Sequence, residues 1–191
     1  MSVVRVGAQQ TTVSVFPASY TAPDIGVTFT INVTVHNVTN LYAGEFKLYY
    51  PSSILNGSSI SEGPFLKTGG VSTAFMVYEF TDAHNETHGC VGVLCTRVGV
   101  EIGVEGDGVL AMITFNSTSL GGPSVLHLAD VKLGDANAIE IPCTAVDGEA
   151  TVIPEFPAFL VMPLFIIVTL VVVALLRSID NHQSIKREPK S

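Results

Sequence analysis

The chain has 191 residues, of which 47% are hydrophobic and 14% charged, and its formal net charge is −8. Residues 1–157 hold five Lys/Arg and fifteen Asp/Glu, an acidic balance that repels phosphate groups, so we expect no nucleic-acid partner. A domain of about 150 residues also buries a core large enough to fold without disulfides.

Residues 1–10 are interpreted as the remnant of a signal peptide or as a disordered N-terminus. The segment has no apolar h-region, but Val6 and Ala8 fit the small-residue pattern that precedes a signal cleavage site. We therefore expect that the true start lies upstream or that a signal was removed. The alternative is a tail-anchored protein whose large domain is cytoplasmic.

Residues 11–153 predict a series of short strands. From Val27 to Val35, apolar residues occupy every second position and Thr or Asn the others, which is the period of a half-buried strand. Clusters such as PSSILNGSS, VEGDG and LGGPS predict turns. Eight or nine strands indicate an all-β antiparallel sandwich of jelly-roll type. The other predicted strands are 11–16, 45–50, 74–80, 90–98, 109–115, 124–133 and 145–153.

The three cysteines allow at most one intramolecular disulfide. Cys90 and Cys95 would stand about 16 Å apart in an extended strand, beyond the roughly 7 Å that a disulfide tolerates. A bridge between them needs a turn, for which Gly92 is the candidate. Pairing of either cysteine with Cys143 is equally open.

The sequence shows no metal-binding or catalytic motif, so we expect no cofactor and no enzyme activity. The cysteine spacing fits no zinc finger, and HNETH, from His84 to His88, lies in a polar loop where a zincin motif would require a helix. The acidic pairs in VEGDG and VDGE are typical turn formers. A further series has hard oxygen ligands for calcium but lacks the alternation of an EF-hand, and we interpret it as a solvated acidic loop: Asp130, Asp135, Asn137 and Glu140.

Five N-x-[ST] motifs predict N-glycosylation and therefore an extracellular domain. Asn32 lies on the polar side of the strand 27–35, so its side chain is expected to face solvent. The glycosylation candidates are Asn32, Asn37, Asn56, Asn85 and Asn116.

Three blocks of sequence, in order, resemble the cohesin domain family over residues 12–153. They are APDIGVTFTINVTVHNVTNLYAGEFKLYYPSSIL, GVEGDGVLAMITF and LADVKLGDANAIEIPCTAVDGEATV. The most specific part is GDGVLAMITF, in which Gly106 and Gly108 are expected to let the chain reverse and Ala111, Ile113 and Phe115 to point into the core.

The resemblance implies a nine-stranded jelly-roll sandwich, related to certain carbohydrate-binding modules, that binds and does not catalyse. Cohesins hold dockerin modules through one sheet face, so a dockerin-like protein is the first expected partner. Fold alone does not decide the partner.

The C-terminal part predicts a membrane anchor. No charged residue occurs from Ala158 to Leu176, a run of 19 residues that would span about 28 Å as a helix. We therefore predict a transmembrane helix over 158–177. Four basic residues follow the uncharged run, at 177, 186, 187 and 190, and basic residues stay on the cytoplasmic side. We therefore expect a cytoplasmic tail over 178–191 and an extracellular domain at the cell surface. In the junction 154–157, Pro154, Glu155 and Phe156 resemble the archaeal PEF-type sorting signal, but the long tail favours a permanent anchor.

Two further functions stay open beside a dockerin-like partner. A carbohydrate-binding module, acting in polysaccharide binding or breakdown, would stack aromatic rings on sugars, for which Tyr42, Tyr49 and Tyr50 are the candidates and are equally fit for core or edge positions. A structural glycoprotein of the archaeal envelope would need only glycans and an acidic surface.

Overall fold

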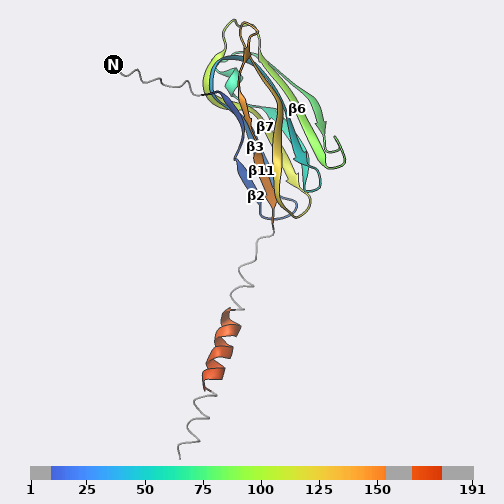
Figure 1. Cartoon of the computed structure of the whole chain (residues 1–191), viewed down its shortest axis with the longest axis vertical. Helices are drawn as coiled ribbons and strands as arrows, with labels where there is room; N and C mark the ends of the chain where they lie inside the picture. Colours follow the sequence, from blue (N-terminus) through green and yellow to red (C-terminus); the bar gives the residue numbers. More distant parts are fainter. Residues whose placement is uncertain (1–9, 154–164, 178–191) are drawn as a thin grey trace, which may run out of the picture. The chain divides into compact units, whose positions relative to one another are not determined.

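The computed structural model describes residues 10–153 and 165–177, which belong to two separate units. Residues 10–153 form a β-sandwich, so the expectation of an all-β, jelly-roll-like domain is confirmed. Its elements are β1 Thr12–Phe16, β2 Ser19–Ala22, β3 Thr28–Pro51, β4 Leu55–Glu62, the 3-10 turn η1 Phe65–Lys67, β5 Thr73–Thr81, β6 His88–Arg97, β7 Val104–Ser117, β8 Gly121–Asp135, β9 Glu140–Ile141, β10 Thr144–Val146 and β11 Gly148–Val152 (Figure 1).

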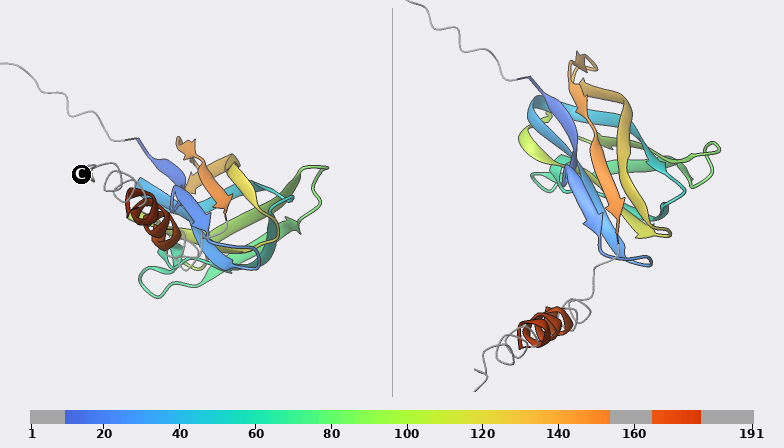
Figure 2. Two further views of the ribbon diagram at one scale, coloured as in Figure 1. Left: turned by 90° about the horizontal axis from the view of Figure 1, so that it is seen from below. Right: turned by 60° about the horizontal axis from the view of Figure 1, so that its bottom comes forward.

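Strand β3 belongs to both sheets of the sandwich. Its first half pairs with β1 and β7, and its second half pairs with β6 and β8. Between the halves, Asn37 and Asn40 have φ of 54° and 56°, and the register with β7 shifts on both sides of Val38. One sheet is therefore β10-β1-β3-β7-β4 and the other is β5-β6-β3-β8, which β9, β11 and β2 extend. Figure 2 shows the strands curving around one interior.

The core lies between these sheets and is filled by alternate residues of each strand. Phe46 and Leu48 of β3 are 1% and 0% exposed, whereas their neighbours Glu45 and Lys47 reach the surface. Burying each such side chain contributes about 1.5–3 kcal/mol to the free energy of folding. The prediction that Ala111, Ile113 and Phe115 point into the core is confirmed, since all three are 0% exposed.

The strand boundaries correct several predictions. Segments 27–35 and 45–50, expected as two strands, are parts of the single strand β3, and the described residues hold eleven strands. The expected turn PSSILNGSS contains the start of β4, and VEGDG and LGGPS lie at the starts of β7 and β8. Asn and Ser are tolerated in β4 because it pairs with β7 at the edge of the sheet and these side chains face water. Gly57 instead lies under Phe80, where an added Cβ would stand 2.3 Å from Cε2.

The sequence predicted that the chain reverses at Gly106 and Gly108. This prediction is wrong, because both residues lie within the continuous strand β7. Gly106 has φ of 99° and pairs with Val38 at a register shift, so its conformational freedom serves a bulge within β7. Gly108 lies under the ring of Phe65, where an added Cβ would stand 2.2 Å from Cδ2. Both glycines therefore shape a continuous strand.

The second unit is a helix over residues 165–177, in which the Thr169 hydroxyl donates to the Phe165 carbonyl at 2.6 Å. In the part of the chain that the structure describes, no helix is both long and apolar enough to cross a membrane. The first residues of the predicted span, 158–164, lie outside the described residues. So do the N-terminal segment 1–9, the PEF motif at Pro154, Glu155 and Phe156, and the tail 178–191.

Candidate functional site

The outer surface of the sheet β5-β6-β3-β8 is the candidate site, and we call it the open face. It is built from the side chains that alternate with the core residues of these four strands, because successive residues of a strand point to opposite sides. Its members include Glu45, Lys47, Tyr49, Met76, Tyr78, Glu79, Cys90, Leu94, His127 and Lys132.

A groove of about 420 Å³ lies at one end of the open face, between β3, β6, β8 and the loop before β9. Tyr42, Leu94 and Lys132 stand around it. Ala43 pairs with Gly134 across β3 and β8, and a Cβ added at Gly134 would meet nothing within 4 Å. Small residues thus leave room for a side chain of a binding partner.

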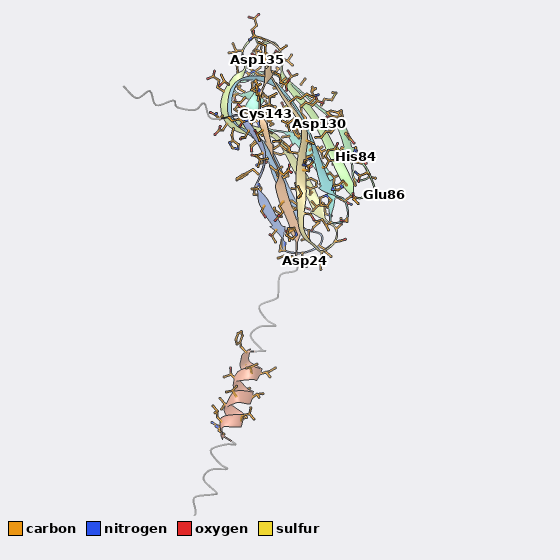
Figure 3. All side chains as sticks on the ribbon, viewed as in Figure 1. Asp24, His84, Glu86, Asp130, Asp135 and Cys143 are labelled. Atoms are coloured by element: carbon orange, nitrogen blue, oxygen red, sulfur yellow. The ribbon has the colours of Figure 1, made fainter. Side chains whose placement is uncertain are left out.

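The loop that borders the groove is held by a carboxylate. Asp135 Oδ1 accepts the backbone N–H groups of Asn137 and Ile139, each at 2.8 Å. These bonds, that of Ile139 first, lower the pKa of Asp135 below its usual value. Asp135 therefore has a structural role in this loop. Asp130 lies elsewhere, with its carboxylate 3.6 Å from Lys47 Nζ. The acidic residues that the sequence suggested as one loop are thus divided between two places (Figure 3).

The middle of the open face carries charges of both signs around an aromatic ring. Tyr78 lies over Gly92, where an added Cβ would stand 2.5 Å from Cε2, and its hydroxyl donates to Glu45 Oε1 at 3.3 Å. Burial, followed by the charge of Glu45, raises the pKa of Tyr78 to about 12, so the phenol stays protonated at neutral pH. Lys132 Nζ lies 4.0 Å from Glu45 Oε2 on the other side.

The other end of the open face collects imidazole, carboxylate and thiol groups. The ring of Tyr49 contacts those of His84 and His127, with centroid distances of 5.1 and 6.3 Å. His84 Nδ1 lies 2.6 Å from Glu79 Oε1. Cys90 is 0% exposed, and its burial, with the negative charge of Glu79, raises its thiol pKa to about 12. In Figure 3, Asp135 at the upper end, then Asp130, then His84 follow one another down the domain.

Among the described residues, Glu79, His84 and Cys90 are the one group of three or more potential metal ligands. The sequence did not predict this group, because His84 belongs to the loop motif HNETH and Cys90 is also a disulfide candidate. Only the pairing of β5 with β6, which sets Thr81 opposite Cys90, brings the three residues together.

The opposite sheet has a more polar surface, rich in Thr, Ser and Asn, although Phe16 of β1 and Val146 of β10 are 59% and 45% exposed on it. Thr30 and Thr114 share a hydroxyl hydrogen bond of 2.9 Å across β3 and β7. Asn32, Asn56 and Asn116 lie on this side, Asn56 exposed and the other two half-buried. Ile31 and Val33, on either side of Asn32 in β3, are buried, so Asn32 points outward as predicted. Its glycosylation stays a prediction.

The remaining two glycosylation candidates are not among the residues that line the groove. Asn37 is exposed at the bend of β3. Asn85 is in the β5–β6 loop, where its Oδ1 accepts the N–H groups of Thr87 and His88 at 2.9 and 2.8 Å. A glycan on Asn85 would stand next to His84, at the end of the open face that is remote from the groove.

The candidate tyrosines separate into core and surface. Tyr50 is 0% exposed, and its hydroxyl donates to Asp82 Oδ1 at 2.6 Å and to the Thr81 carbonyl at 3.1 Å, so its ring is not available to a sugar. Tyr42 and Tyr49 are half-buried, Tyr42 beside the groove and Tyr49 at the His84 end of the open face.

The three cysteines are free thiols in the structure. Cys90 and Cys95 are both on β6 but five residues apart, so they face opposite sides of the sheet: Cys95 joins the core, and Cys90 faces outward. Cys143 is half-buried just before β10. No turn forms at Gly92, the condition that a Cys90–Cys95 disulfide needed.

Solved structures share this fold at low sequence identity. The non-cellulosomal cohesin of the hyperthermophilic archaeon Archaeoglobus fulgidus has a TM-score of 0.58 and 18% identity, over 79% of this chain and 96% of that one. CaCohA2 of Clostridium acetobutylicum has 0.59 and 20%, over 76% and 93%. The Coh-OlpC–Doc435 type I cohesin–dockerin complex of Clostridium thermocellum has 0.57 and 15%, over 75% and 92%. Comparison with curated proteins finds no match.

A β-sandwich with a grooved, partly apolar sheet face is suited to binding. The cohesin domain family model matches residues 13–152, which is most of the chain, and the chain therefore belongs to the cohesin domain family. Members of this family are non-catalytic binding modules, and several of the similar structures are complexes of a cohesin with a dockerin.

Proposed function

We propose that this cohesin domain holds a partner protein, of dockerin-like type, through the open face. The observation that carries the proposal is the groove bordered by Tyr42, Leu94 and Lys132, set beside the exposed ring of Tyr78. Protein interfaces combine a small apolar centre with a polar rim, and aromatic residues are enriched in them.

The two sheets differ in the way that this proposal requires. The open face offers Met76 and Tyr78, 52% and 40% exposed, together with charges of both signs. The opposite sheet offers mainly hydroxyl and amide groups, with Phe16 and Val146 exposed on β1 and β10, and it carries three glycosylation candidates, whose glycans would exclude a partner there. A partner is therefore expected to bind the open face.

A polysaccharide is the weaker candidate ligand. Of the three tyrosines named for sugar stacking, Tyr50 is buried, and Tyr49 already contacts the rings of His84 and His127. A single remaining ring, Tyr42, gives little stacking area. Binding of the domain to a glycan array, abolished in Tyr42→Ala, would nevertheless favour this function over the proposed one.

The test is binding of the full chain to a panel of purified dockerin modules by isothermal titration calorimetry. Leu94→Asp places a charge at the groove and should weaken binding by about 30-fold or more, as expected for an interface residue that contributes about 2 kcal/mol. Thr30→Asp makes the same charge on the opposite sheet and should leave binding unchanged. Equal losses in both variants, or no binding to any dockerin, would refute the proposal.

We also propose that the domain is extracellular and that residues 158–177 anchor it in the membrane, with the tail 178–191 in the cytoplasm. The uncharged run, the basic residues after it and the five glycosylation motifs support this location. Mass spectrometry of membrane-extracted protein should recover the intact C-terminus. Recovery only of chains that end near Phe156 would show cleavage at the PEF motif instead.

A further inference from the structure

Glu79, His84 and Cys90 bring three different metal-ligand types to one place. Each offers one ligand atom, a carboxylate oxygen, an imidazole nitrogen and a thiol sulfur, and these atoms all lie within 4.8 Å of one another. They come from β5, from the β5–β6 loop and from β6. Their side chains lie at the end of the open face that is remote from the groove, so the groove does not account for them.

The local structure holds the three residues in place without an ion. In the β5–β6 pairing, Thr81 lies opposite Cys90 and Glu79 opposite Gly92, which sets the thiol and the carboxylate on the same side of the sheet. The loop is closed by hydrogen bonds from the backbone N–H groups of His84 and Asn85 to the His88 carbonyl, each 3.1 Å. Such preorganisation lowers the entropy lost when a ligand binds.

Cys90 differs from the buried cysteine of the core. Cys95 packs among core residues and donates to the Gly44 carbonyl at 3.4 Å. Cys90 is equally inaccessible but faces away from the core, against the polar side chains of Tyr49 and Glu79. Cys95 fills space in the apolar core, whereas the Cys90 thiol lies beside a carboxylate and an imidazole, which apolar packing does not require.

We propose that Glu79, His84 and Cys90 bind a divalent ion of the zinc class, as three protein ligands with a fourth position left open. Thiolate and imidazole select zinc and similar borderline-soft ions over calcium or magnesium, and a carboxylate commonly completes such a set. On binding, the thiol proton passes to solvent, the proton shared by His84 Nδ1 and Glu79 Oε1 moves to His84 Nε2 or to solvent, and the freed Nδ1 and Oε1 bind the ion.

The three ligand atoms, which all lie within 4.8 Å of one another, would have to move by on the order of 1 Å to surround an ion. Tetrahedral zinc with bonds of about 2.0–2.3 Å sets its ligand atoms about 3.3–3.6 Å apart. His84 Nδ1 and Glu79 Oε1, now 2.6 Å apart, would separate by about 0.7 Å. Their side chains are 33% and 24% exposed, so both have room to turn.

The test is titration of the full chain, in mild detergent, with Co²⁺ as a spectroscopic probe for the zinc class. We expect one Co²⁺ per chain, a sulfur-to-cobalt charge-transfer band and the visible bands of a tetrahedral ion, all removed by Zn²⁺. Zn²⁺ should also raise the melting temperature, since an ion that binds only the folded state stabilises it. These readouts need no protein partner, so they stand or fall independently of the proposed function.

Variants locate the site. Cys90→Ser should abolish the charge-transfer band, and His84→Ala and Glu79→Gln should each weaken binding by about tenfold or more. Matched controls are Cys143→Ser and His88→Ala, which should leave the titration unchanged. Because His84 lies in an exposed loop, its variant tests the site even if Cys90→Ser fails to fold.

Three outcomes would overturn the proposal. They are the absence of a stoichiometric cobalt spectrum in the wild-type chain, a charge-transfer band that persists in Cys90→Ser, and equal weakening by His84→Ala and His88→Ala. The last outcome would indicate that loop imidazoles bind the ion without a defined site.

Discussion

At the scale of single residues, one partly buried polar cluster links three strands. Asp82 Oδ1 accepts the Tyr50 hydroxyl at 2.6 Å and the Gly57 backbone N–H at 2.8 Å, and thereby connects β3 with β4 next to the end of β5. Burial and the bond to Asp82 raise the pKa of Tyr50, so the phenol remains a donor. Buried polar groups stabilise a fold only when they are hydrogen-bonded in this way.

Replacing Tyr50 by phenylalanine should therefore destabilise the domain. Loss of the hydroxyl removes a bond to a charged acceptor, and we expect the free energy of unfolding to fall by about 1.5–3 kcal/mol in urea denaturation. Tyr42→Phe, at the half-buried groove tyrosine, should change it by less than about 0.5 kcal/mol. Equal effects of the two variants would contradict the cluster.

The cysteines should differ in reactivity. Burial raises the thiol pKa of Cys90 and of Cys95 to about 12, so at pH 8 only about one part in 10⁴ of either is thiolate, whereas Cys143 is partly exposed. Iodoacetamide should label Cys143 first, with the other two labelled only on unfolding. Peptide mapping that finds any two of the three in a disulfide would refute the free-thiol state.

At the scale of elements, the strand pattern was predictable and the strand ends were not. The alternation in 27–35 and 109–115 identified the central strands because their two faces differ sharply in polarity. β4 was not predicted, because its Asn, Gly and Ser residues are also typical of turns. Only the pairing with β7 shows that this segment is a strand and not a turn. The join of two predicted strands into β3 depends on Asn37 and Asn40 adopting positive φ, which no pattern of polarity encodes.

The contact of β7 with η1 gives a prediction at this scale. Gly108→Ala would place Cβ 2.2 Å from Phe65 Cδ2 and must displace a side chain that is 7% exposed. We expect a loss of about 1–3 kcal/mol in the free energy of unfolding. Gly134→Ala, where the new Cβ meets nothing within 4 Å, is the matched control and should change it by less than about 0.5 kcal/mol. Similar losses at both glycines would count against this close packing.

The loop beside the groove should respond to acid. Because the folded-state pKa of Asp135 lies below its usual 3.8, the ionised carboxylate stabilises the loop above that pH, and this contribution is lost as pH falls through the lowered pKa. Amide NMR signals of Asn137 and Ile139 should titrate with a midpoint below 3.8. Asp135→Asn should abolish the transition, and a midpoint above 3.8 would contradict the bonding described.

At the scale of the whole molecule, the two outer faces of the sandwich carry different groups: the open face has the groove and the metal-ligand group, and the opposite sheet has mainly hydroxyl and amide side chains. Sequence predicted the all-β class and the family, since alternation and the block Gly106–Phe115 are local signals. It did not predict the groove or the metal-ligand group, because their members, such as Tyr42 and Lys132 or Glu79 and Cys90, meet only through strand pairing. Glycosylation candidates were visible in the sequence, but the position of three of the five on the sheet opposite the groove was not.

The most direct test of the central proposal is hydrogen–deuterium exchange of the full chain with and without the dockerin that binds it most tightly. If the open face is the binding surface, exchange should slow at β3 from Ala43 to Tyr49, at β6 and at β8 from His127 to Asp135. It should be unchanged at β1, β4 and β7. Protection of those three strands, with the open face unaffected, would contradict the account.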